Sequence, residues 1–378
     1  MNSMRTRRNL EGFPVSERSA NNSYRYACHC DTCRRTTGNV YYIDASWPAP
    51  RSSVDISALK VYHFGPSCDL SFCGTCSTPL FTSNPKDPDQ SLGVFTGTLD
   101  NIPEDLIKIV EHIFVGDTKD GGASMWMRSV NADGEEAKRF TERSQDGTVD
   151  PLPIGWPANE TMTGFETWKD DTVRILCKCE GVDLLWHKGN YEGKKKEELP
   201  WFIDPTTHKS LAGFCSCDSC RLFSGVDLCN WTYGELKYIS FPTSGTPNDK
   251  PFPSNTSDLK ALVDVKDPSI GTLAYYASSP DVQRYFCGSC SASIFYAVDD
   301  RLEIVDVAIG VLRASDGARA EGFLSWALGV IGHIVDSKGG WRYGLLERVT
   351  KEMEEWRIER GYPKCWRRVE REEAAKKV

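Results

Sequence analysis

Short apolar runs dominate the hydrophobic pattern of this chain. Residues 172–179 and 181–187 are rich in β-branched, aromatic and leucine side chains, and a turn-prone pair, Glu180 and Gly181, stands where they meet. Residues 301–312 show the same pattern. Runs of this length and composition are typical of strands, and the sequence therefore predicts a mainly β fold.

A helical pattern is predicted only near the C-terminus. It covers residues 343–360 and stops before Gly361 and Pro363, two residue types that commonly follow the end of a helix. Residues 351–378 mix both signs of charge, and we interpret this run as a solvent-facing helical surface.

Two stretches of the sequence occur twice, in the same order. CHCDTCRRTTG at 28–38 matches CSCDSCRLFSG at 215–225. FCGTCSTPLF at 72–81 matches FCGSCSASIF at 286–295. A repeat at such a long interval indicates duplication of a whole domain, because solenoids repeat at much shorter periods.

The length of 378 residues agrees with two related domains, because one hydrophobic core rarely serves so long a chain. A stretch rich in Pro and Gly separates the copies. The predicted organisation is a first copy at 1–146, a linker at 147–171, a second copy at 172–345 and a charged, helical tail at 346–378. The second copy also contains a Pro-, Ser- and Thr-rich insertion at 241–260, which we expect to be a surface loop.

Composition places the chain among soluble globular proteins, with 40% hydrophobic and 26% charged residues. The net charge of −8 disfavours general binding of nucleic acid, which needs a basic face. The apolar run at 323–335 is too short to span a bilayer, so no membrane association is expected. Residues 1–14 lack the apolar stretch of a secretory signal. The expected location is the cytoplasm, with the nucleus as the alternative.

The chain contains 15 cysteines, most of them in short clusters. In an intracellular protein such clusters favour metal or redox chemistry over disulfides. The clusters are Cys28, Cys30 and Cys33; Cys73 and Cys76; Cys177 and Cys179; Cys215, Cys217 and Cys220; and Cys287 and Cys290. Cys68, Cys229 and Cys365 stand alone, and we interpret them as inert thiols.

The second copy supplies a complete set of ligands for a structural zinc ion. Zinc prefers four thiolate or imidazole ligands in a tetrahedron. Cys177 and Cys179 would come from one hairpin, and Cys287 and Cys290 from another. We therefore predict a closed four-cysteine site whose binding energy stabilises the fold.

The C-x-C-x-x-C cluster formed by Cys215, Cys217 and Cys220 differs in kind. It gives three thiolates on one tight loop and no obvious fourth ligand, and an open coordination position is where zinc performs chemistry. Such a site could hold water or capture a substrate thiolate, which suits addition of a thiol to an aldehyde or the reverse cleavage. A fourth protein ligand would instead make this site structural. His29 is a candidate hydrogen-bond donor beside the matching cluster of the first copy, although Ser216 replaces it in the second.

Taken in order, these cysteine motifs resemble those of the glutathione-dependent formaldehyde-activating enzyme family, which includes the centromere-protein-V-like proteins. In the second copy the resemblance rests on CKCEGV at 177–182, CSCDSCRLFSG at 215–225 and RYFCGSC at 284–290. It covers most of residues 172–315, and a partial version covers about 24–115.

The resemblance implies β-tent domains built from small antiparallel sheets, with two zinc ions in each domain. One zinc is structural, and the other sits on the three-cysteine loop and binds the glutathione sulfur. The implied activity is that of a carbon–sulfur lyase, which combines glutathione and formaldehyde into S-hydroxymethylglutathione. Carried over by position, the active-type ligands are Cys215, Cys217 and Cys220, and in the first copy Cys28, Cys30 and Cys33.

The first copy departs from the family pattern, because no cysteine precedes Cys28. Its Cys73 and Cys76 pair therefore lacks the C-x-C partner that the second copy has. Three explanations are open: substitute ligands, with Cys68 and His63 as candidates; absence of a structural zinc; or a missing hairpin that lies outside this sequence.

Three functions are weighed on these residues. The leading one is a zinc-dependent lyase acting on a small-molecule thiol or thiol adduct, such as a glutathione conjugate. The alternative is a non-catalytic tandem zinc module that binds protein partners, motivated by the incomplete first copy and the charged tail. A third, redox function would use a C-x-x-C pair, but such a pair needs a helix N-terminus to lower the thiol pKa, and strand-like residues follow both pairs.

Overall fold

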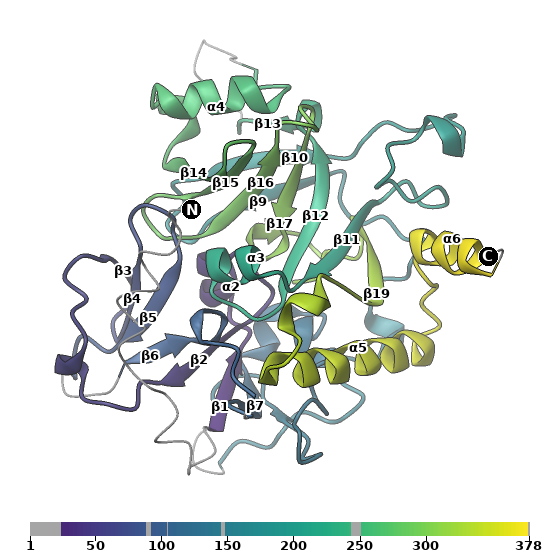
Figure 1. Cartoon of the computed structure of the whole chain (residues 1–378). Helices are drawn as coiled ribbons and strands as arrows, with labels where there is room; N and C mark the ends of the chain where they lie inside the picture. The colour runs from purple at the N-terminus through teal and green to yellow at the C-terminus, as the bar shows by residue number, and fades with distance from the viewer. Residues whose placement is uncertain (1–23, 88–91, 104, 145–147, 243–250, 377–378) are drawn as a thin grey trace.

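The computed structural model of the chain (Figure 1) describes residues 24–87, 92–103, 105–144, 148–242 and 251–376. Residues 243–250 of the insertion predicted at 241–260 and residues 1–23 of the first predicted copy lie outside these residues. Within the described part, no helix combines the length and the apolar character needed to cross a membrane.

The described residues of the first half form one eight-stranded sheet. Its strands are β1 (Tyr24–Cys28), β2 (Tyr42–Ser46), β3 (Lys60–Gly65), β4 (Cys68–Phe72), β5 (Pro79–Ser83), β6 (Gly93–Phe95), β7 (Lys108–Ile113) and β8 (Lys138–Arg139). They lie in the order β3-β4-β5-β6-β2-β1-β7-β8. β7 runs parallel to both β1 and β8, and the other neighbours are antiparallel.

The second half forms a seven-stranded and a four-stranded sheet. Its strands are β9 (Thr172–Leu176), β10 (Asp183–His187), β11 (Ser210–Cys215), β12 (Cys229–Glu235), β13 (Ile239–Ser240), β14 (Leu273–Ser279), β15 (Val282–Cys287), β16 (Ser293–Val298), β17 (Ile304–Ala308), β18 (Leu312–Arg313) and β19 (Leu324–Gly332). The hairpin predicted from 172–179 and 181–187 is β9 and β10, which belong to the four-stranded sheet β13-β10-β9-β18. The mainly β fold is confirmed.

The larger sheet of the second half has the order β14-β15-β16-β17-β12-β11-β19. This is the order of the first sheet when strands are matched by their place in the chain. Both sheets are antiparallel except at one end, where β1 lies parallel to β7 and β11 parallel to β19, each pair with a register shift. In both sheets a cysteine ends the strand that precedes a helix. Cys28 of β1 pairs with Tyr42 of β2, and Cys215 of β11 pairs with Cys229 of β12.

Five α-helices accompany the sheets within the described ranges. They are α2 (Asp31–Thr37), α3 (Asp218–Ser224), α4 (Thr256–Asp264), α5 (Trp341–Glu359) and α6 (Trp366–Ala375). The expectation of helix only near the C-terminus is wrong for α2, α3 and α4. The first two span seven residues each, too few to show a helical period, and α4 begins inside the predicted insertion loop, where Asn255 caps it by accepting from the Asp258 N–H.

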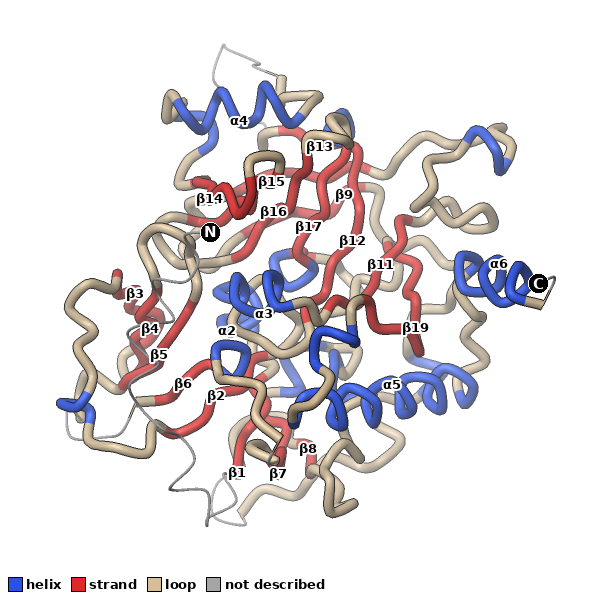
Figure 2. Tube along the Cα trace, in the orientation of Figure 1, coloured by secondary structure: helices blue, strands red, loops and turns tan. Residues whose placement is uncertain are grey.

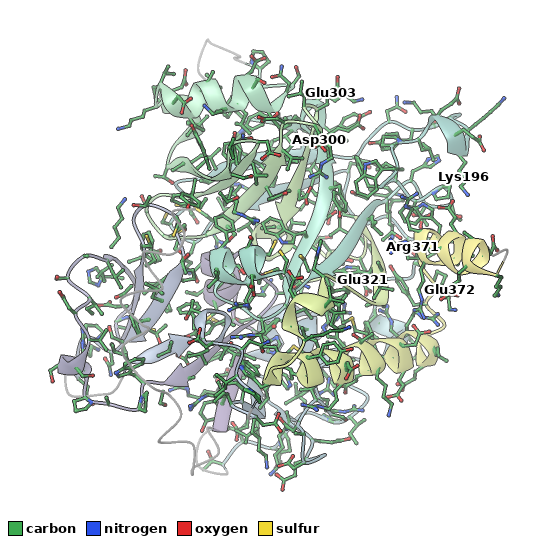
Figure 3. All side chains as sticks on the ribbon, viewed as in Figure 1. Lys196, Asp300, Glu303, Glu321, Arg371 and Glu372 are labelled. Carbon is green, nitrogen blue, oxygen red and sulfur yellow. The ribbon has the colours of Figure 1, made fainter. Side chains whose placement is uncertain are left out.

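The charged tail is less exposed than its composition predicts. Helix α5 packs on β19, and Met353 and Trp356 on its inner face are buried. Glu321, labelled in Figure 3, is also buried and forms ion pairs with Arg319 at 3.0 Å and with Arg360 at 2.7 Å, which ties the start of β19 to the end of α5. The interpretation of residues 351–378 as a solvent-facing surface is therefore wrong for α5, because apolar residues interrupt the charges at helical spacing.

The two halves share one hydrophobic core. Its largest cluster includes Val40 and Ile43 from the first half, Trp126 from the segment after it, and Phe295 and Trp326 from the second half. Figure 2 shows α2 and α3 at the centre of the molecule, with strands of both large sheets around them. The halves are thus packed on one another and are not independent domains joined only by a linker.

Reciprocal contacts connect the halves at these helices. α2 packs on the 3₁₀ turn η10 (Ile309–Val311) of the second half, and α3 packs on η3 (Thr96–Thr98) of the first. The Gly310 N–H donates to the Gly38 carbonyl, and the Gly97 N–H donates to the Gly225 carbonyl, both at 2.9 Å. Each half therefore binds the end of the other half's cysteine-bearing helix.

The helix ends demand glycine for two separate reasons. Gly38 and Gly225 close α2 and α3 with φ of 76° and 74°, in the left-handed region. A Cβ atom on Gly38 would lie 2.5 Å from the Ser293 carbonyl oxygen, and one on Gly225 would lie 2.6 Å from Cγ of Pro79. Any side chain here would force the halves apart.

Candidate metal centres

Four cysteines of the second half meet in one buried cluster. Cys177 and Cys179 lie in the turn of the β9–β10 hairpin. Cys287 ends β15, and Cys290 lies in the turn between β15 and β16. Sγ of Cys179 lies 3.6 Å from that of Cys177 and 3.4 Å from that of Cys287, and all four sulfurs lie within 4.8 Å of one another. A tetrahedral metal with thiolates at about 2.3 Å spaces them about 3.8 Å apart, so the cluster fits such an ion.

Local backbone geometry supports this cluster. The Val182 N–H donates to Sγ of Cys177 at 3.2 Å, and the Cys290 N–H donates to Sγ of Cys287 at 3.4 Å. Amide donors of this kind stabilise thiolates and fix their direction. The structure brings together the four residues that the sequence assigned to a closed site.

Cys215, Cys217 and Cys220 form a second cluster. Cys215 ends β11, Cys217 caps the N-terminus of α3, and Cys220 lies in its first turn. The Cys220 N–H donates to Sγ of Cys217 at 3.4 Å. Hydrogen bonds from the thiols of Cys215 and Cys220 lower the pKa of the Cys217 thiol to about 2. The three sulfurs lie within 4.8 Å of one another, and no fourth His, Cys, Asp or Glu of the described residues joins them.

The first half repeats this geometry with Cys28, Cys30 and Cys33. Cys30 caps α2 at φ −63° and ψ 153°, and Cys217 caps α3 at φ −63° and ψ 149°. The Cys33 N–H donates to Sγ of Cys30 at 3.3 Å. Hydrogen bonds that Cys30 makes with the side chains of Cys28 and Cys33 lower the pKa of the Cys30 thiol to about 3. The three sulfurs again form a group within 4.8 Å.

One residue beside the second cluster was not given a role from the sequence. Arg284 of β15 is buried, and its Nη1 donates to Sγ of Cys220 at 3.6 Å. It belongs to the RYFCGSC motif, but the motif alone does not show that the side chain points at another cysteine loop. Leu70 holds the matching position of β4, as the strand register shows: Leu70 pairs with Thr82, and Arg284 pairs with Tyr296.

Carboxylates gather near the first cluster. The pKa of the Cys68 thiol is raised to about 12 by burial and by the charges of Asp44, Asp69 and Cys30. Asp117 accepts from the Asp31 N–H at the N-terminus of α2. Burial and the Cys30 thiolate raise the pKa of the Asp117 carboxyl.

Cys73 and Cys76 remain a pair. Within the described residues, no third metal-binding side chain groups with them. Both are partly exposed, whereas Cys287 and Cys290 are buried beneath the β9–β10 hairpin. The pair was predicted as a metal ligand, and the described structure gives it no further partner.

The substitute ligands considered for this pair are wrong. Cys68 begins β4, and Cys73 follows its other end, about 17 Å away at strand geometry. Nδ1 of His63 lies 2.6 Å from Oδ1 of Asp69, also in the part of β4 near Cys68. Both side chains therefore lie at the wrong end of the strand.

His29 does not reach a cysteine sulfur. Its Nε2 lies 2.9 Å from Nδ1 of His112, whose Nε2 lies 2.9 Å from the Met127 carbonyl oxygen, and both rings are fully buried. Burial, followed by the nearby His112 and Arg34, lowers the pKa of His29 well below its usual range. This pair is part of the core beside the first cluster.

The solitary cysteines join no metal group among the described residues. Cys229 is buried with its Sγ 3.0 Å from Oγ of Ser224, and Cys365 is buried at the start of α6. Burial raises the pKa of both thiols, which keeps them protonated and unreactive.

Comparison with known proteins identifies a family that resembles the first half of the chain. The family model described as "Glutathione-dependent formaldehyde-activating enzyme" matches residues 15–117, which include the Cys28, Cys30 and Cys33 cluster together with Cys73 and Cys76. No curated protein and no solved structure matches the chain. The resemblance recognised from the cysteine motifs is thus shown for the first half.

Proposed function

We propose that the chain is a zinc-dependent carbon–sulfur lyase-type enzyme that acts on a thiol adduct, with glutathione as the thiol and formaldehyde as the aldehyde. The observation that carries this proposal is the cluster of Cys215, Cys217 and Cys220, which offers three converging thiolates and no fourth protein ligand among the described residues. The family match supports glutathione and formaldehyde as the substrates.

The fit of zinc rests on the donor set. Three or four thiolates within 4.8 Å suit a soft, tetrahedral ion, and they exclude ions such as magnesium that prefer oxygen ligands. When bound at an open position, zinc favours the thiolate form of a substrate thiol and fixes its sulfur.

The residues of the second half would divide the remaining work. Cys215 is placed by the end of β11, and Cys217 and Cys220 by the first turn of α3, so a strand and a helix hold the ligands rigidly. In the reaction the thiol sulfur bonds to the aldehyde carbon, the C=O π bond opens, and the thiol proton is transferred to the aldehyde oxygen. No electrons are gained or lost, so no redox partner is needed.

We also propose that the chain arose by tandem duplication of one domain. The matching strand order of the two large sheets supports this, as do the nearly identical cap angles at Cys30 and Cys217. The copies would extend over residues 1–146 and 172–345, joined by 147–171. The first copy lacks the counterpart of the β9–β10 hairpin among its described strands, which explains its unpaired Cys73 and Cys76.

The decisive experiment compares wild-type protein with Cys217→Ser. Purified zinc-loaded protein is mixed with glutathione and formaldehyde, and exchange with S-hydroxymethylglutathione is followed by NMR. We expect wild-type protein to accelerate the exchange and Cys217→Ser to leave only the uncatalysed rate, with an unchanged circular dichroism spectrum. No acceleration by wild-type protein would remove the lyase proposal and favour the interaction module. Unfolding of Cys217→Ser would instead mark that zinc as structural.

A further inference from the structure

The two three-cysteine clusters have the same backbone but different surroundings. Beside the second cluster, Arg284 is only 6% exposed and lies over the rings of Phe223 and Tyr296, at 5.6 and 4.9 Å from their centroids. These contacts aim its guanidinium at Cys220, to which Nη1 donates at 3.6 Å. Two aromatic rings contact the side chain, and its Nε donates to Oγ of Ser278 at 3.2 Å, which fixes its direction.

The position of Arg284 is set by the four-cysteine cluster. It lies on β15, three residues before Cys287. In the sheet Arg284 pairs with Tyr276 of β14 on one side and with Tyr296 of β16 on the other. The structural cluster thus anchors the strand that delivers a cation to the open one. The positive charge beside the three-cysteine cluster therefore depends on the four-cysteine cluster as well.

The first cluster has no such cation from the matching strand. Leu70 occupies the equivalent position on β4 and is 1% exposed. Asp117 instead places negative charge near Cys30, and Asp44 and Asp69 place it at the neighbouring Cys68. Arg34 of α2 does place positive charge near Cys30, but Arg221 holds the matching position of α3, so this cation does not distinguish the two clusters.

This contrast changes what each cluster could bind. A divalent ion held by three thiolates carries a net charge of −1, and a substrate thiolate as fourth ligand makes it −2. In a partly buried site that added charge is costly unless a cation lies close by. Arginine provides this cation, and leucine does not.

We infer that Arg284 is a positioning residue that makes the second cluster the thiol-binding centre, whereas the first cluster, with Leu70, does not capture an anionic thiol. The inference rests on the proposed function for its ligand class, glutathione. It assigns one thiol per chain, although the chain has two clusters of the same backbone geometry.

Cobalt(II) provides a probe that does not depend on turnover. Each thiolate on Co²⁺ adds to the sulfur-to-metal charge-transfer absorption, so capture of glutathione increases it. In Cys30→Ser protein, where the second cluster remains, we expect one glutathione to bind with an unchanged dissociation constant. In Cys217→Ser protein, where the first cluster remains, we expect no increase. Equal glutathione binding by both variants would overturn the inference.

Substitution at position 284 tests the residue itself. We expect Arg284→Met to weaken glutathione binding by about tenfold or more, because a buried charge loses its partner. Arg284→Lys should retain part of the glutathione affinity, and Leu70→Met, the matched control, should leave that affinity unchanged. Circular dichroism and cobalt content check that each variant folds and holds metal. Unchanged glutathione affinity in folded Arg284→Met would refute the role of Arg284.

The outcomes separate this inference from the proposed function. Glutathione binding that depends on Arg284, without any acceleration of the exchange, would remove the lyase activity and keep the inference. Full activity and full thiol affinity in Arg284→Met would keep the lyase and remove the inference.

Discussion

Ser77 and Ser291 exchange hydrogen bonds across the two halves of the molecule. Oγ of Ser77 donates to the Ser291 carbonyl and Oγ of Ser291 donates to the Ser77 carbonyl, both at 2.8 Å. Each serine directly follows the second cysteine of a C-x-x-C pair, each is buried, and their φ angles are 63° and 69°. The turns of the two C-x-x-C pairs are therefore in direct contact.

This contact predicts a coupling between the two serines. Ser77→Ala and Ser291→Ala should each lower the free energy of unfolding by about 1–3 kcal/mol, because each leaves a buried carbonyl without its donor. The double variant should lose an amount of unfolding free energy that differs clearly from the sum of the two single losses, because contacting residues do not act independently. Denaturant unfolding of the three variants measures this. Strict additivity would contradict a direct contact.

Metal content separates the two C-x-x-C pairs. We expect three metal ions per chain, one for each cysteine group of the described structure. Cys287→Ser should reduce the count to two and lower the unfolding free energy, because metal binding contributes to folding. Cys73→Ser, the matched control in the first half, should keep three. Atomic emission spectroscopy gives the count. Four ions in wild-type protein and three in Cys73→Ser would show that this pair does bind metal.

Arg35 links the first three-cysteine helix to the four-cysteine cluster. Its Nε donates to the Leu176 carbonyl at 3.0 Å and its Nη2 to the Cys177 carbonyl at 2.7 Å. Arg35→Ala should lower the unfolding free energy by about 2–4 kcal/mol, because two buried carbonyls lose a charged donor. It should also weaken metal binding by Cys177 and its partners.

Arg35→Lys is the control for this prediction. Lysine keeps the charge but cannot span two carbonyls with one planar group, so we expect an intermediate loss. Chelator competition followed by thermal unfolding measures both effects. Wild-type stability in Arg35→Ala would show that the two carbonyls find other donors.

Glu352 of α5 predicts a dependence of stability on pH. It accepts from the Ser129 N–H with both oxygens, at 3.1 and 3.0 Å, and burial raises the pKa of its carboxyl to about 7. A carboxyl whose pKa is higher in the folded protein is more stable there when protonated. Its favourable contribution is complete below the unfolded pKa of about 4.3 and is lost as pH rises through 7.

Glu352→Gln should therefore flatten the profile. Between pH 5 and pH 8.5 we expect the wild-type protein to lose up to about 3 kcal/mol more than Glu352→Gln. Comparing the two proteins at each pH cancels the pH dependence of the metal sites, which both contain. Parallel profiles would show that this carboxyl does not titrate near neutrality.

The metal clusters could be predicted from the sequence because their chemistry is local. C-x-C-x-x-C places three sulfurs on one strand–helix corner, and the paired motifs leave few ways to complete a site. The hairpin of β9 and β10 was equally visible, since its strands are short, apolar and separated by a turn.

What the sequence could not predict depends on contacts between distant segments. Helix α2 is too short for a periodic pattern, and its cap is a cysteine instead of a Ser or Asp. The direction of Arg284 depends on Phe223 and Tyr296, which belong to other elements. The burial of Trp356 depends on where α5 packs, which its charged composition conceals.

The reciprocal contacts between the halves have a further consequence. Two identical chains assembled in this way would carry every substitution at both sites at once. Here one polypeptide supplies both partners, so each half can have its own residue at any matched position. The positions at the contact, Ser77 and Ser291, are the same, while those facing the clusters, Leu70 and Arg284, differ. The serine contact keeps the same residue in both halves, whereas the residues beside the two metal clusters are free to differ.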